Sequence, residues 1–380
     1  MKTEVIGAGF VNKGAELMVH AIYQQINDNL PNSRLVLPAN NNCPYEKRAY
    51  FNAFQKISLK RYGLDIGHYL QALLPKLLKR QLGLIDDNDI DVVLDASGFA
   101  YSDQWGVKDT LVTANYFEKL KKDKDVKVIL LPQAFGPFTS EGIKKAFQKL
   151  IDNSDLVFPR DDISYKYVTE LVGKQEKIIQ APDFTNLLHG KKPENFQRYE
   201  GKICITPNYR MLDKTSSSDK YVPFMSFCIN ELLSRGEELF FLIHEGDKDL
   251  WLAEEINKSC NSTLGIIHES DPLVIKGLIK ECKGVVGSRF HGLVSALSQG
   301  VPTLAVGWSH KYDMLFKDYN FPEGSLSMEM SKEDLSQILT VLTDQDRLDS
   351  LKETLSIASK EQKELSKQMW AQVFTCIGKD

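Results

Sequence analysis

The sequence predicts an α/β protein with two domains, each built on a parallel β-sheet that helices cover on both faces. Short apolar runs alternate with helical patterns along the whole chain of 380 residues. Glycines and polar residues follow many of these runs, as expected where buried parallel strands end in loops. A chain of this length also exceeds one typical hydrophobic core and suits two domains of about 150 to 190 residues each.

Nine of the apolar runs are predicted to be strands, and the first residues of the chain also look strand-like. The runs in the first half are 35–37, 91–96, 126–131 and 155–158, and those in the second half are 203–206, 239–243, 265–268, 284–286 and 303–306. Two such sets predict two Rossmann-like domains. Because ligands of open parallel sheets bind beyond the carboxyl ends of the strands, the two sheets are expected to face each other across a cleft.

The domain boundary is predicted within 190–201, where charged residues and Pro193 interrupt the periodicity. The predicted parts are an N-terminal domain over residues 1–190, a C-terminal domain over 200–345 and an amphipathic helix over 346–380. We expect this helix to cross back to the first domain, because its apolar stripe must be buried. The stripe consists of Leu351, Leu355, Leu365, Met369, Trp370, Val373 and Phe374. Before it, Ser331 and Asp334 resemble a capping box that opens another helix.

Charge and composition exclude several classes of protein. The net charge of −4 argues against a nucleic-acid-binding protein, which usually carries a basic domain. The six cysteines form no CxxC pair and the histidines are dispersed, so we predict no metal site. No apolar run is long enough for a membrane span, and the first residues lack the apolar core of a signal peptide. We therefore expect a cytoplasmic protein that does not bind nucleic acid.

Residues 45–84 form a basic segment with interleaved aromatic residues. Its basic residues are Lys47, Arg48, Lys56, Lys60, Arg61, Lys76, Lys79 and Arg80, and its aromatic residues include Tyr50, Phe51, Phe54, Tyr62 and Tyr69. Such a segment predicts a peripheral contact with the inner membrane surface or with a lipid diphosphate. The alternative is an ordinary solvated helical face.

Polar residues at the predicted strand ends of the first half are candidates for substrate binding. A glycine-rich turn holds Gly7, Asn12 and Glu16, but it lacks the GxGxxG pattern and the distal acid of a dinucleotide site. Near the end of the second apolar run, Asp95, or Asp103 after it, is a candidate acceptor for the proton of a sugar hydroxyl. Both residues could equally be helix caps and turn formers. At the next two ends lie Gln133 and Arg160, and Arg160 is suited to capture a phosphate or carboxylate unless it pairs with Asp161 or Asp162.

The second half carries the most informative segment, residues 284–311. It predicts a strand, a turn with Ser288, Arg289 and His291, a helix closed by Gly300, and a second strand followed by Lys311. A helix start offers free N–H groups and the positive end of a dipole, so this turn predicts an anion site. Two other strand ends add Asn208, Arg210 and His244, of which His244 is a candidate base or a structural hydrogen-bonding residue.

Together these motifs resemble the polysaccharide pyruvyl transferase family. The resemblance covers nearly the whole chain, and its most specific part is Ser288-Arg289-Phe290-His291-Gly292 followed by Gly300-Val301-Pro302. The other elements are the turn with Asn12, Gly14 and Glu16, residues 95–99, 133–138, 160–164 and 181–183, and Lys311. The chain departs from the family pattern at Ala96 and Ser97, where glycines are commoner, and at Ala15, where an acidic residue often stands.

The resemblance implies a GT-B-like fold and a reaction in which phosphoenolpyruvate is the donor. Its pyruvyl group would form a cyclic ketal with two hydroxyls of a sugar, or of a lipid-linked oligosaccharide, in a surface-polysaccharide precursor, and phosphate would leave. No cofactor is implied. Arg160, Arg289 and Lys311 would bind the donor's negative charges, and His291 would deliver a proton to its methylene carbon, with Asp95 or Glu16 as base.

Two other functions remain open at the level of sequence. A nucleotide-sugar glycosyltransferase could use the same architecture and a basic residue against a diphosphate, because fold does not decide function. A noncatalytic carbohydrate-binding relative would keep ligand binding without turnover. His291 itself has a second interpretation, as a hydrogen-bond donor to phosphate that never transfers a proton.

Overall fold

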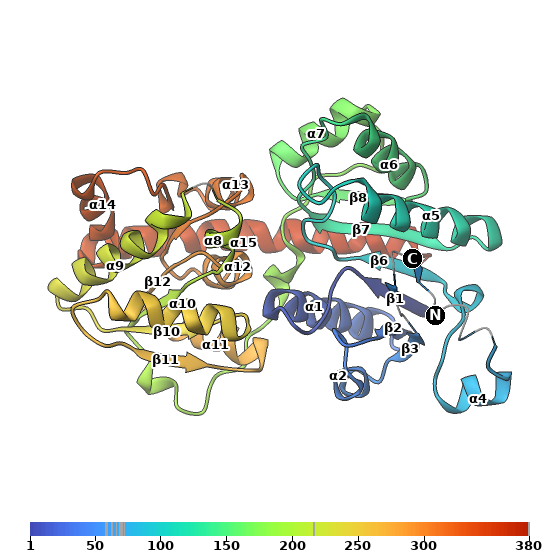
Figure 1. The fold of residues 1–380 in the computed structure, drawn as a ribbon, viewed down its shortest axis with the longest axis horizontal. Coiled ribbons are helices and arrows are strands. Elements are labelled where there is room, and N and C mark those ends of the chain that lie inside the picture. The colour runs from blue at the N-terminus through green and yellow to red at the C-terminus, as the bar shows by residue number, and fades with distance from the viewer. Residues whose placement is uncertain are drawn as a thin grey trace. The chain divides into compact units, whose positions relative to one another are not determined.

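The computed structural model describes residues 1–57, 60–61, 64–65, 67, 71, 73–215 and 217–378 (Figure 1). Within them the chain forms two compact units. Unit 1 comprises Met1–Val11, Met18–Phe184 and Ser366–Asp380, and unit 2 comprises Asn12–Leu17 and Thr185–Leu365. The first turn of one helix thus belongs to unit 2 although the rest of that helix belongs to unit 1.

Unit 1 contains a six-stranded parallel sheet in the order β3-β2-β1-β6-β7-β8. The strands are β1 (Lys2–Ile6), β2 (Arg34–Ala39), β3 (Phe54–Ile57), β6 (Val92–Asp95), β7 (Lys127–Gln133) and β8 (Leu156–Pro159), and β4 (Lys60–Arg61) pairs antiparallel with β5 (Leu64–Asp65). The helices are α1 (Lys13–Asn29), α2 (Tyr45–Tyr50), α4 (Lys76–Gln81), α5 (Val107–Asp123), α6 (Glu141–Asp152) and α7 (Asp162–Val172), with a 3₁₀ turn at Asp87–Asp89.

The predicted runs of the first half coincide with strands because their residues are buried almost completely. Val93, Leu94, Val128 and Leu130 are fully buried, and they face neighbouring strands in a continuous parallel register. Phe117 of α5 and Phe147 of α6 pack in the same core cluster as Val93 and Val128. This apolar packing stabilises the sheet and fixes where each strand ends.

Unit 2 contains a second six-stranded parallel sheet in the order β11-β10-β9-β12-β13-β14. The strands are β9 (Ile203–Thr206), β10 (Leu239–Ile243), β11 (Gly265–His268), β12 (Gly284–Gly287), β13 (Thr303–Val306) and β14 (Ser325–Leu326). The helices are α8 (Arg210–Asp213), α9 (Ser218–Ser234), α10 (Gly246–Lys258), α11 (Pro272–Glu281), α12 (Phe290–Leu297), α13 (Lys311–Asp318), α14 (Lys332–Leu339) and α15 (Gln345–Cys376). Among the described residues, 3₁₀ turns lie at Phe184–Leu187, where the chain passes from unit 1 to unit 2, and at Phe196–Arg198, Pro322–Gly324 and Thr340–Leu342.

The predicted helix start at Ser331 is confirmed, with Ser331 as the N-cap of α14. The hydroxyl of Ser331 accepts a hydrogen bond from the backbone N–H of Asp334 and contacts the Asp334 carboxylate at 2.7 Å. These contacts occupy a donor that the helix itself leaves unpaired.

The C-terminal helix α15 begins within unit 2, and its last residues belong to unit 1. Trp370 packs against Phe184 there, edge to face, with ring centroids 6.1 Å apart. The predicted buried stripe is wrong at Leu365, which is 45% exposed. Two polar residues are buried beside it instead, because each has a backbone partner: Gln362 donates to the carbonyl of Asp318 and Ser366 to that of Asp183. Among the residues that the structure describes, no helix is both long and apolar enough to cross a membrane.

Candidate functional site

The predicted polar residues of unit 1 lie at one edge of its sheet. Gly7 follows β1, Asp95 ends β6, Gln133 ends β7 and Arg160 follows β8, and these strands are neighbours in the sheet. Parallel strands present their carboxyl ends at the same edge, which is why four residues far apart in the sequence come together. Their strand-end positions agree with the sequence analysis.

Asp95 is completely buried at this edge, and its carboxylate is fully engaged. The backbone N–H and the hydroxyl of Ser97 donate to it at 3.0 and 2.5 Å, and the hydroxyl of Tyr101 donates to its other oxygen. Burial raises the pKa of Asp95, and the bonds from Ser97 and Tyr101 counteract that rise. The geometry therefore gives Asp95 the role of holding the turn after β6, and it offers no exposed carboxylate for a sugar hydroxyl.

Arg160 is also buried, and it forms an ion pair with Asp183 at 3.1 Å. This partner lies 23 residues away in the sequence, whereas the sequence alternative named the adjacent Asp161 or Asp162. Asp161 caps α7 by accepting from the backbone N–H of Ser164 at 2.7 Å.

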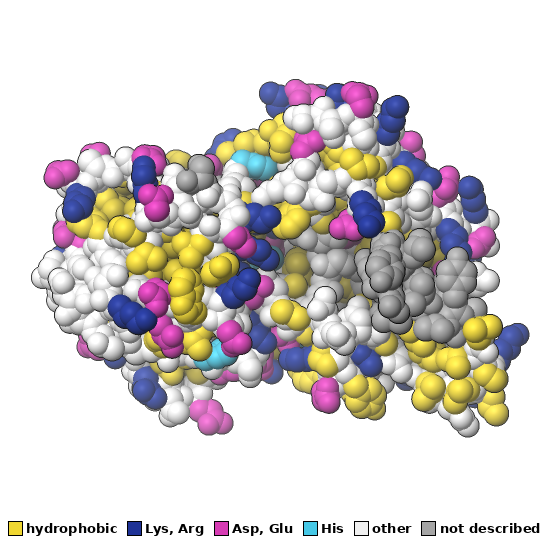
Figure 2. Space-filling model, viewed as in Figure 1, with side chains coloured by type: hydrophobic (Ala, Val, Ile, Leu, Met, Phe, Trp, Pro, Cys, Tyr) yellow, Lys and Arg dark blue, Asp and Glu magenta, His cyan; other side chains and the backbone are white. Residues whose placement is uncertain are grey.

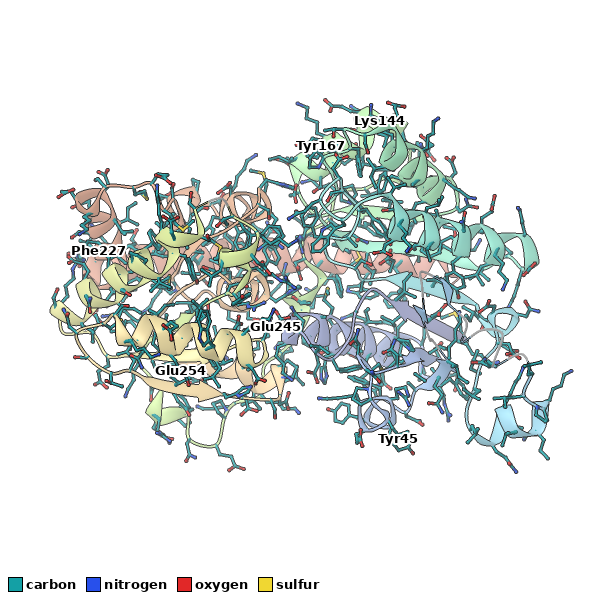
Figure 3. All side chains as sticks on the ribbon, viewed as in Figure 1. Tyr45, Lys144, Tyr167, Phe227, Glu245 and Glu254 are labelled. Carbon is teal, nitrogen blue, oxygen red and sulfur yellow. The ribbon has the colours of Figure 1, made fainter. Side chains whose placement is uncertain are left out.

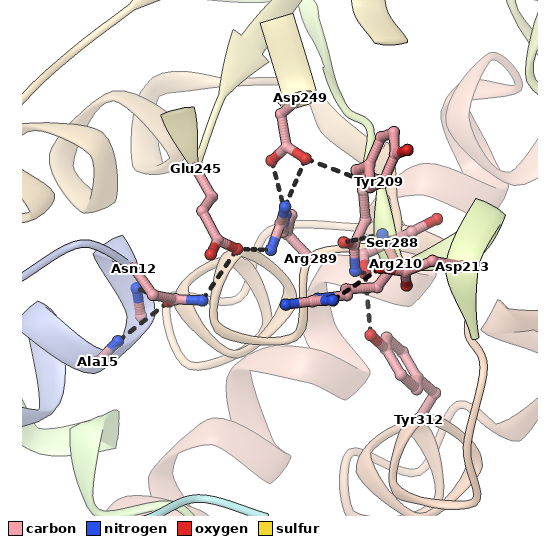
Figure 4. Close-up of polar contacts among 12 residues, drawn as sticks. Asn12, Ala15, Tyr209, Arg210, Asp213, Glu245, Asp249, Ser288, Arg289 and Tyr312 are labelled. Atoms are coloured by element: carbon pink, nitrogen blue, oxygen red, sulfur yellow. Dashed lines mark hydrogen bonds and ion pairs between the residues drawn. The ribbon is translucent and has the colours of Figure 1, made fainter. Parts of the chain in front are cut away.

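In unit 2 the cation at the start of α12 is enclosed by acidic side chains (Figure 4). Arg289 forms a two-pronged ion pair with Asp249 of α10, and its guanidinium also pairs with Glu245. Burial alone would lower the pKa of Arg289, but the Asp249 and Glu245 carboxylates raise it. Arg289 therefore remains charged, and its charge is balanced by two carboxylates within the protein.

Glu245 connects this ion pair to the start of α1. The side-chain amide of Asn12 donates to Glu245 at 3.0 Å, while its oxygen caps α1 by accepting from the backbone N–H groups of Gly14 and Ala15 (Figure 4). Glu245 immediately precedes α10 and is labelled in Figure 3. One asparagine thus orders both a helix start and a carboxylate 233 positions away in the sequence.

The start of α1 also lies against His291. A methyl group placed on Gly14 would fall 2.7 Å from Cγ of the His291 ring, so only glycine permits this approach. The neighbouring Lys13 forms an ion pair with the buried Glu16 at 2.9 Å. Residues 12–17 belong to unit 2, and they carry the amide of Asn12, the ammonium of Lys13 and the carboxylate of Glu16.

His244 follows β10 and is almost completely buried. Burial, together with the positive charges of Arg289, His291 and Lys13, lowers its pKa to about 3. His244 is therefore neutral at physiological pH. A neutral imidazole at this place can exchange hydrogen bonds but cannot serve as an acid.

Asn208 and Ser288 are buried and hold the ends of β9 and β12 together. The Asn208 amide donates to the backbone carbonyl of Ser288 at 2.7 Å, and Tyr312 donates to the same carbonyl at 2.9 Å. Tyr221 donates to the Ser288 hydroxyl at 3.0 Å. These predicted substrate-binding residues are thus part of the scaffold beneath the polar cluster.

Arg210 and Lys311 lie nearer the solvent. Arg210 pairs with Asp213 at 2.7 Å on the short helix α8, and its side chain is 46% exposed. Lys311 is the first residue of α13, and its ammonium lies 4.6 Å from the ring centre of Trp308. Among the described residues, no group of three or more His, Cys, Asp or Glu side chains is arranged to hold a metal ion.

Asp249, Glu245 and Lys13 were missed as site residues by sequence reasoning. Glu245 lies beside the predicted His244, so the strand end itself was a usable signal. Asp249 lies one helical turn further along α10, and nothing in its local sequence marks it as the partner of a residue 40 positions away. We name Asn12, Lys13, Glu16, His244, Glu245, Asp249, Arg289 and His291 the polar cluster of unit 2.

Comparisons with known proteins show the family to which this chain belongs. The family model described as polysaccharide pyruvyl transferase matches residues 12–310. No curated protein sequence matches the chain. The described fold resembles several solved structures, each of them at low sequence identity.

S. aureus MnaA, solved with UDP, has a TM-score of 0.63 at 12% identity, with 100% of this chain and 97% of that chain covered. The UDP-GlcNAc 2-epimerase of Neisseria meningitidis, bound to UDP-GlcNAc, has a TM-score of 0.61 at 10% identity, with 99% and 100% covered. Anabaena HepE, in complex with UDP and glucose, has a TM-score of 0.60 at 12% identity, with 98% of each chain covered.

These similarities show a GT-B-like fold, in agreement with the two parallel sheets, and at such identities they show the fold alone. The family match is of another kind, because it extends over most of the chain and includes the turn with Arg289 and His291. The chain belongs to the polysaccharide pyruvyl transferase family.

Proposed function

We propose that the protein transfers the pyruvyl group of phosphoenolpyruvate to two hydroxyls of a sugar in a surface-polysaccharide precursor. The observation that carries the proposal is the family match over residues 12–310, which includes every member of the polar cluster of unit 2. The proposed acceptor is a sugar or a lipid-linked oligosaccharide. Because phosphoenolpyruvate is made in the cytoplasm, we propose that the enzyme acts there.

The reaction needs one proton delivered to carbon. Protonation of the methylene carbon of phosphoenolpyruvate makes a methyl group and leaves a cationic centre at the adjacent carbon. The first sugar hydroxyl adds to that carbon and loses its proton, phosphate then leaves, and the second hydroxyl of the same sugar adds and loses its proton. Two hydroxyl protons leave the acceptor, and they balance the proton gained by the methyl carbon and the one gained on releasing phosphate.

The two histidines of the polar cluster are not equivalent as proton donors. With a pKa near 3, His244 does not form the imidazolium, the stronger acid, at neutral pH. His291 stands at the first turn of α12, where helix N–H groups also favour an anion. We therefore assign the proton transfer to His291 and a hydrogen-bonding role to His244.

The ion pairs of the structure change the roles that we propose for the charged residues. Because two carboxylates balance Arg289, we propose that it positions Glu245 and that the α12 start and Lys311 bind the donor's negative charges. Asp95 is enclosed, and Glu16 is 1% exposed and paired with Lys13, so neither provides an accessible base. The Glu245 side chain is 24% exposed, and we propose it as the base that receives the hydroxyl proton.

The test measures phosphate release and the mass of the product with phosphoenolpyruvate and a panel of sugar and lipid-linked acceptors. His291→Gln is expected to lower turnover by about 10²- to 10⁴-fold without changing the free energy of unfolding. His268→Gln, at the exposed end of β11, is the matched control and should retain turnover.

Two outcomes would contradict the proposal. Consumption of a sugar nucleotide with no response to phosphoenolpyruvate would identify a glycosyltransferase. Calorimetric binding of phosphoenolpyruvate without turnover on any acceptor would instead identify a noncatalytic relative. Full pyruvyl transfer by a folded His291→Gln variant would remove His291 from the mechanism but leave the reaction assigned.

A further inference from the structure

The basic segment 45–84 does not act as one surface. Lys56 forms ion pairs with Glu4 and Asp87 at 3.2 and 2.7 Å, and Lys79 pairs with Asp86 at 2.7 Å. Arg48 donates to the side chain of Gln55 at 2.9 Å. These basic groups are engaged within unit 1, and Tyr62 and Tyr69 of the sequence prediction lie outside the described residues.

The exposed leucines of the segment lie on α4 and beside it, whereas at α2 the segment exposes Tyr45 and Tyr50. Leu73 is 82% exposed and Leu77 70%, and Leu82 is about half exposed. Lys76 and Arg80 are exposed beside them. We call these five residues the α4 surface. Figure 2 shows the corresponding hydrophobic side chains gathered at the lower right, over α4.

The backbone around α4 is anchored to the sheet, so its exposed leucines are held in place. Gln55 of β3 donates its backbone N–H to Gly83 and accepts from Ile85, both at 2.9 Å. Its side chain donates to the carbonyl of Leu82 at 2.6 Å. None of the six residues of α4 is buried. A helix this short has little stability by itself, and here its apolar side chains add nothing to the core.

The charges around these leucines indicate what covers them. The sequence from 66 to 85 contains no Asp or Glu, although the whole chain has a net charge of −4. Exposed leucines flanked by Lys76 and Arg80 match the chemistry of an anionic bilayer surface, which takes up apolar side chains and attracts cations. A second copy of the chain, docked through the same patch, would bring Lys76 and Arg80 against their own equivalents and be repelled.

We propose that the α4 surface docks this protein on an anionic phospholipid membrane. Leu73, Leu77 and Leu82 enter the interface between head groups and acyl chains, and Lys76 and Arg80 contact lipid phosphates. This inference concerns binding alone and does not depend on the proposed pyruvyl transfer. It would bring the enzyme to the surface where a lipid-linked acceptor resides.

The test is co-sedimentation of the full chain with vesicles of phosphatidylcholine, with and without phosphatidylglycerol. We expect binding to the anionic vesicles that weakens as salt is raised, and little binding to neutral ones. The Leu73→Gln, Leu77→Gln double variant should lose roughly tenfold or more in affinity. The Lys76→Glu, Arg80→Glu double variant should lose roughly fivefold per removed cation.

Matched controls separate the α4 surface from general effects. Leu111→Gln on α5 removes another exposed leucine of unit 1, and the Lys108→Glu, Lys174→Glu double variant changes net charge as much as the Lys76, Arg80 variant does. Both should bind nearly as wild type. Thermal unfolding of every variant shows whether it is folded, since these substitutions lie on the surface.

Three results would overturn the proposal: no binding of the wild type to anionic vesicles, equal loss in the α4 and control variants, or self-association that the Leu73, Leu77 variant abolishes. The last would assign the α4 surface to a contact between two copies.

Discussion

At the scale of single residues, the Arg289 ion pair is the feature that most changes the interpretation of the sequence. An arginine at a helix start predicts an anion site, but here its guanidinium is already paired with Asp249 and Glu245. Breaking a buried ion pair by removing one partner leaves the other charge uncompensated, at a cost of about 3–5 kcal/mol. Arg289 is thus expected to matter for both the fold of unit 2 and the position of Glu245.

Asp249→Asn is expected to destabilise the protein by about 3 kcal/mol, because Arg289 then stays buried with only Glu245 as a charged partner. Asp213→Asn, which breaks the exposed pair with Arg210, is the control and should cost less than about 1 kcal/mol. The measurement is urea unfolding of each variant. Equal and small effects of the two substitutions would show that the buried pair does not stabilise the fold.

The lowered pKa of His244 predicts how the stability of the protein depends on pH. Its pKa is lowered to about 3 in the folded protein, against about 6.5 in the unfolded chain, so below pH 6.5 the unfolded state binds the additional proton. Its contribution to stability is therefore complete above pH 6.5 and is lost as the pH falls toward 3, by roughly 1 kcal/mol per pH unit. Urea unfolding of His244→Gln between pH 7 and 4 should show a shallower dependence than the wild type. Parallel curves for the two proteins would contradict the shifted pKa.

At the scale of elements, the start of α1 brings distant parts of the chain into contact. Asn12 caps the helix and donates to Glu245, while Gly14 leaves room for the His291 ring. These two residues, both in unit 2, connect the start of the helix to α10 and α12. The local geometry at the start of α1 therefore serves the polar cluster.

The substitution Gly14→Ala tests whether this contact sets the position of the His291 ring. Alanine favours the helix, but its methyl group would push the His291 ring away. We expect turnover to fall by at least roughly tenfold, because small displacements of a catalytic group are costly, while unfolding stability changes little. Steady-state kinetics together with thermal unfolding measures both effects. Unchanged turnover would show that the position of the His291 ring is not set by this contact.

The elements differ in how far the sequence predicted them. The strands were predicted well because runs such as 239–243 and 284–286 are buried on both faces and therefore uniformly apolar. The strand-end positions of Asp95, Arg160, Arg289 and His291 followed from that. The partners Asp183 and Asp249 did not, because they lie 23 and 40 residues away and are brought there by tertiary packing that leaves no local pattern. Roles that depend on the exposure of a side chain, such as that of Asp95, could therefore not be predicted from the sequence.

At the scale of the whole molecule, α15 contributes to both compact units. Its residues up to Leu365 belong to unit 2, and those from Ser366 onward belong to unit 1. Trp370, 2% exposed, packs against Phe184 at the end of the unit 1 chain segment and stacks on Phe374. The helix therefore completes the core of a unit whose other residues end almost two hundred positions earlier.

Trp370→Ala is expected to cost about 3–5 kcal/mol of stability in unit 1, since it removes a large buried side chain. Hydrogen exchange should show faster exchange in the strands of unit 1 than in those of unit 2. Leu365→Ala, on the exposed side of the same helix, is the control and should leave exchange unchanged. Equal acceleration in both units would mean that the two unfold as one cooperative body.

The division of α1 between the units has a consequence for recombination between related genes. A crossover near residue 185 would deliver unit 2 with the amino-terminal region of another parent, and with it a foreign version of residues 12–17. Where that parent has another residue at position 12, Glu245 would lose its amide partner, and where it lacks a glycine at position 14, His291 would meet a side chain. With such a parent, a functional chimera has to inherit this hexapeptide together with the carboxy-terminal part, so the unit of exchange is discontinuous in the gene.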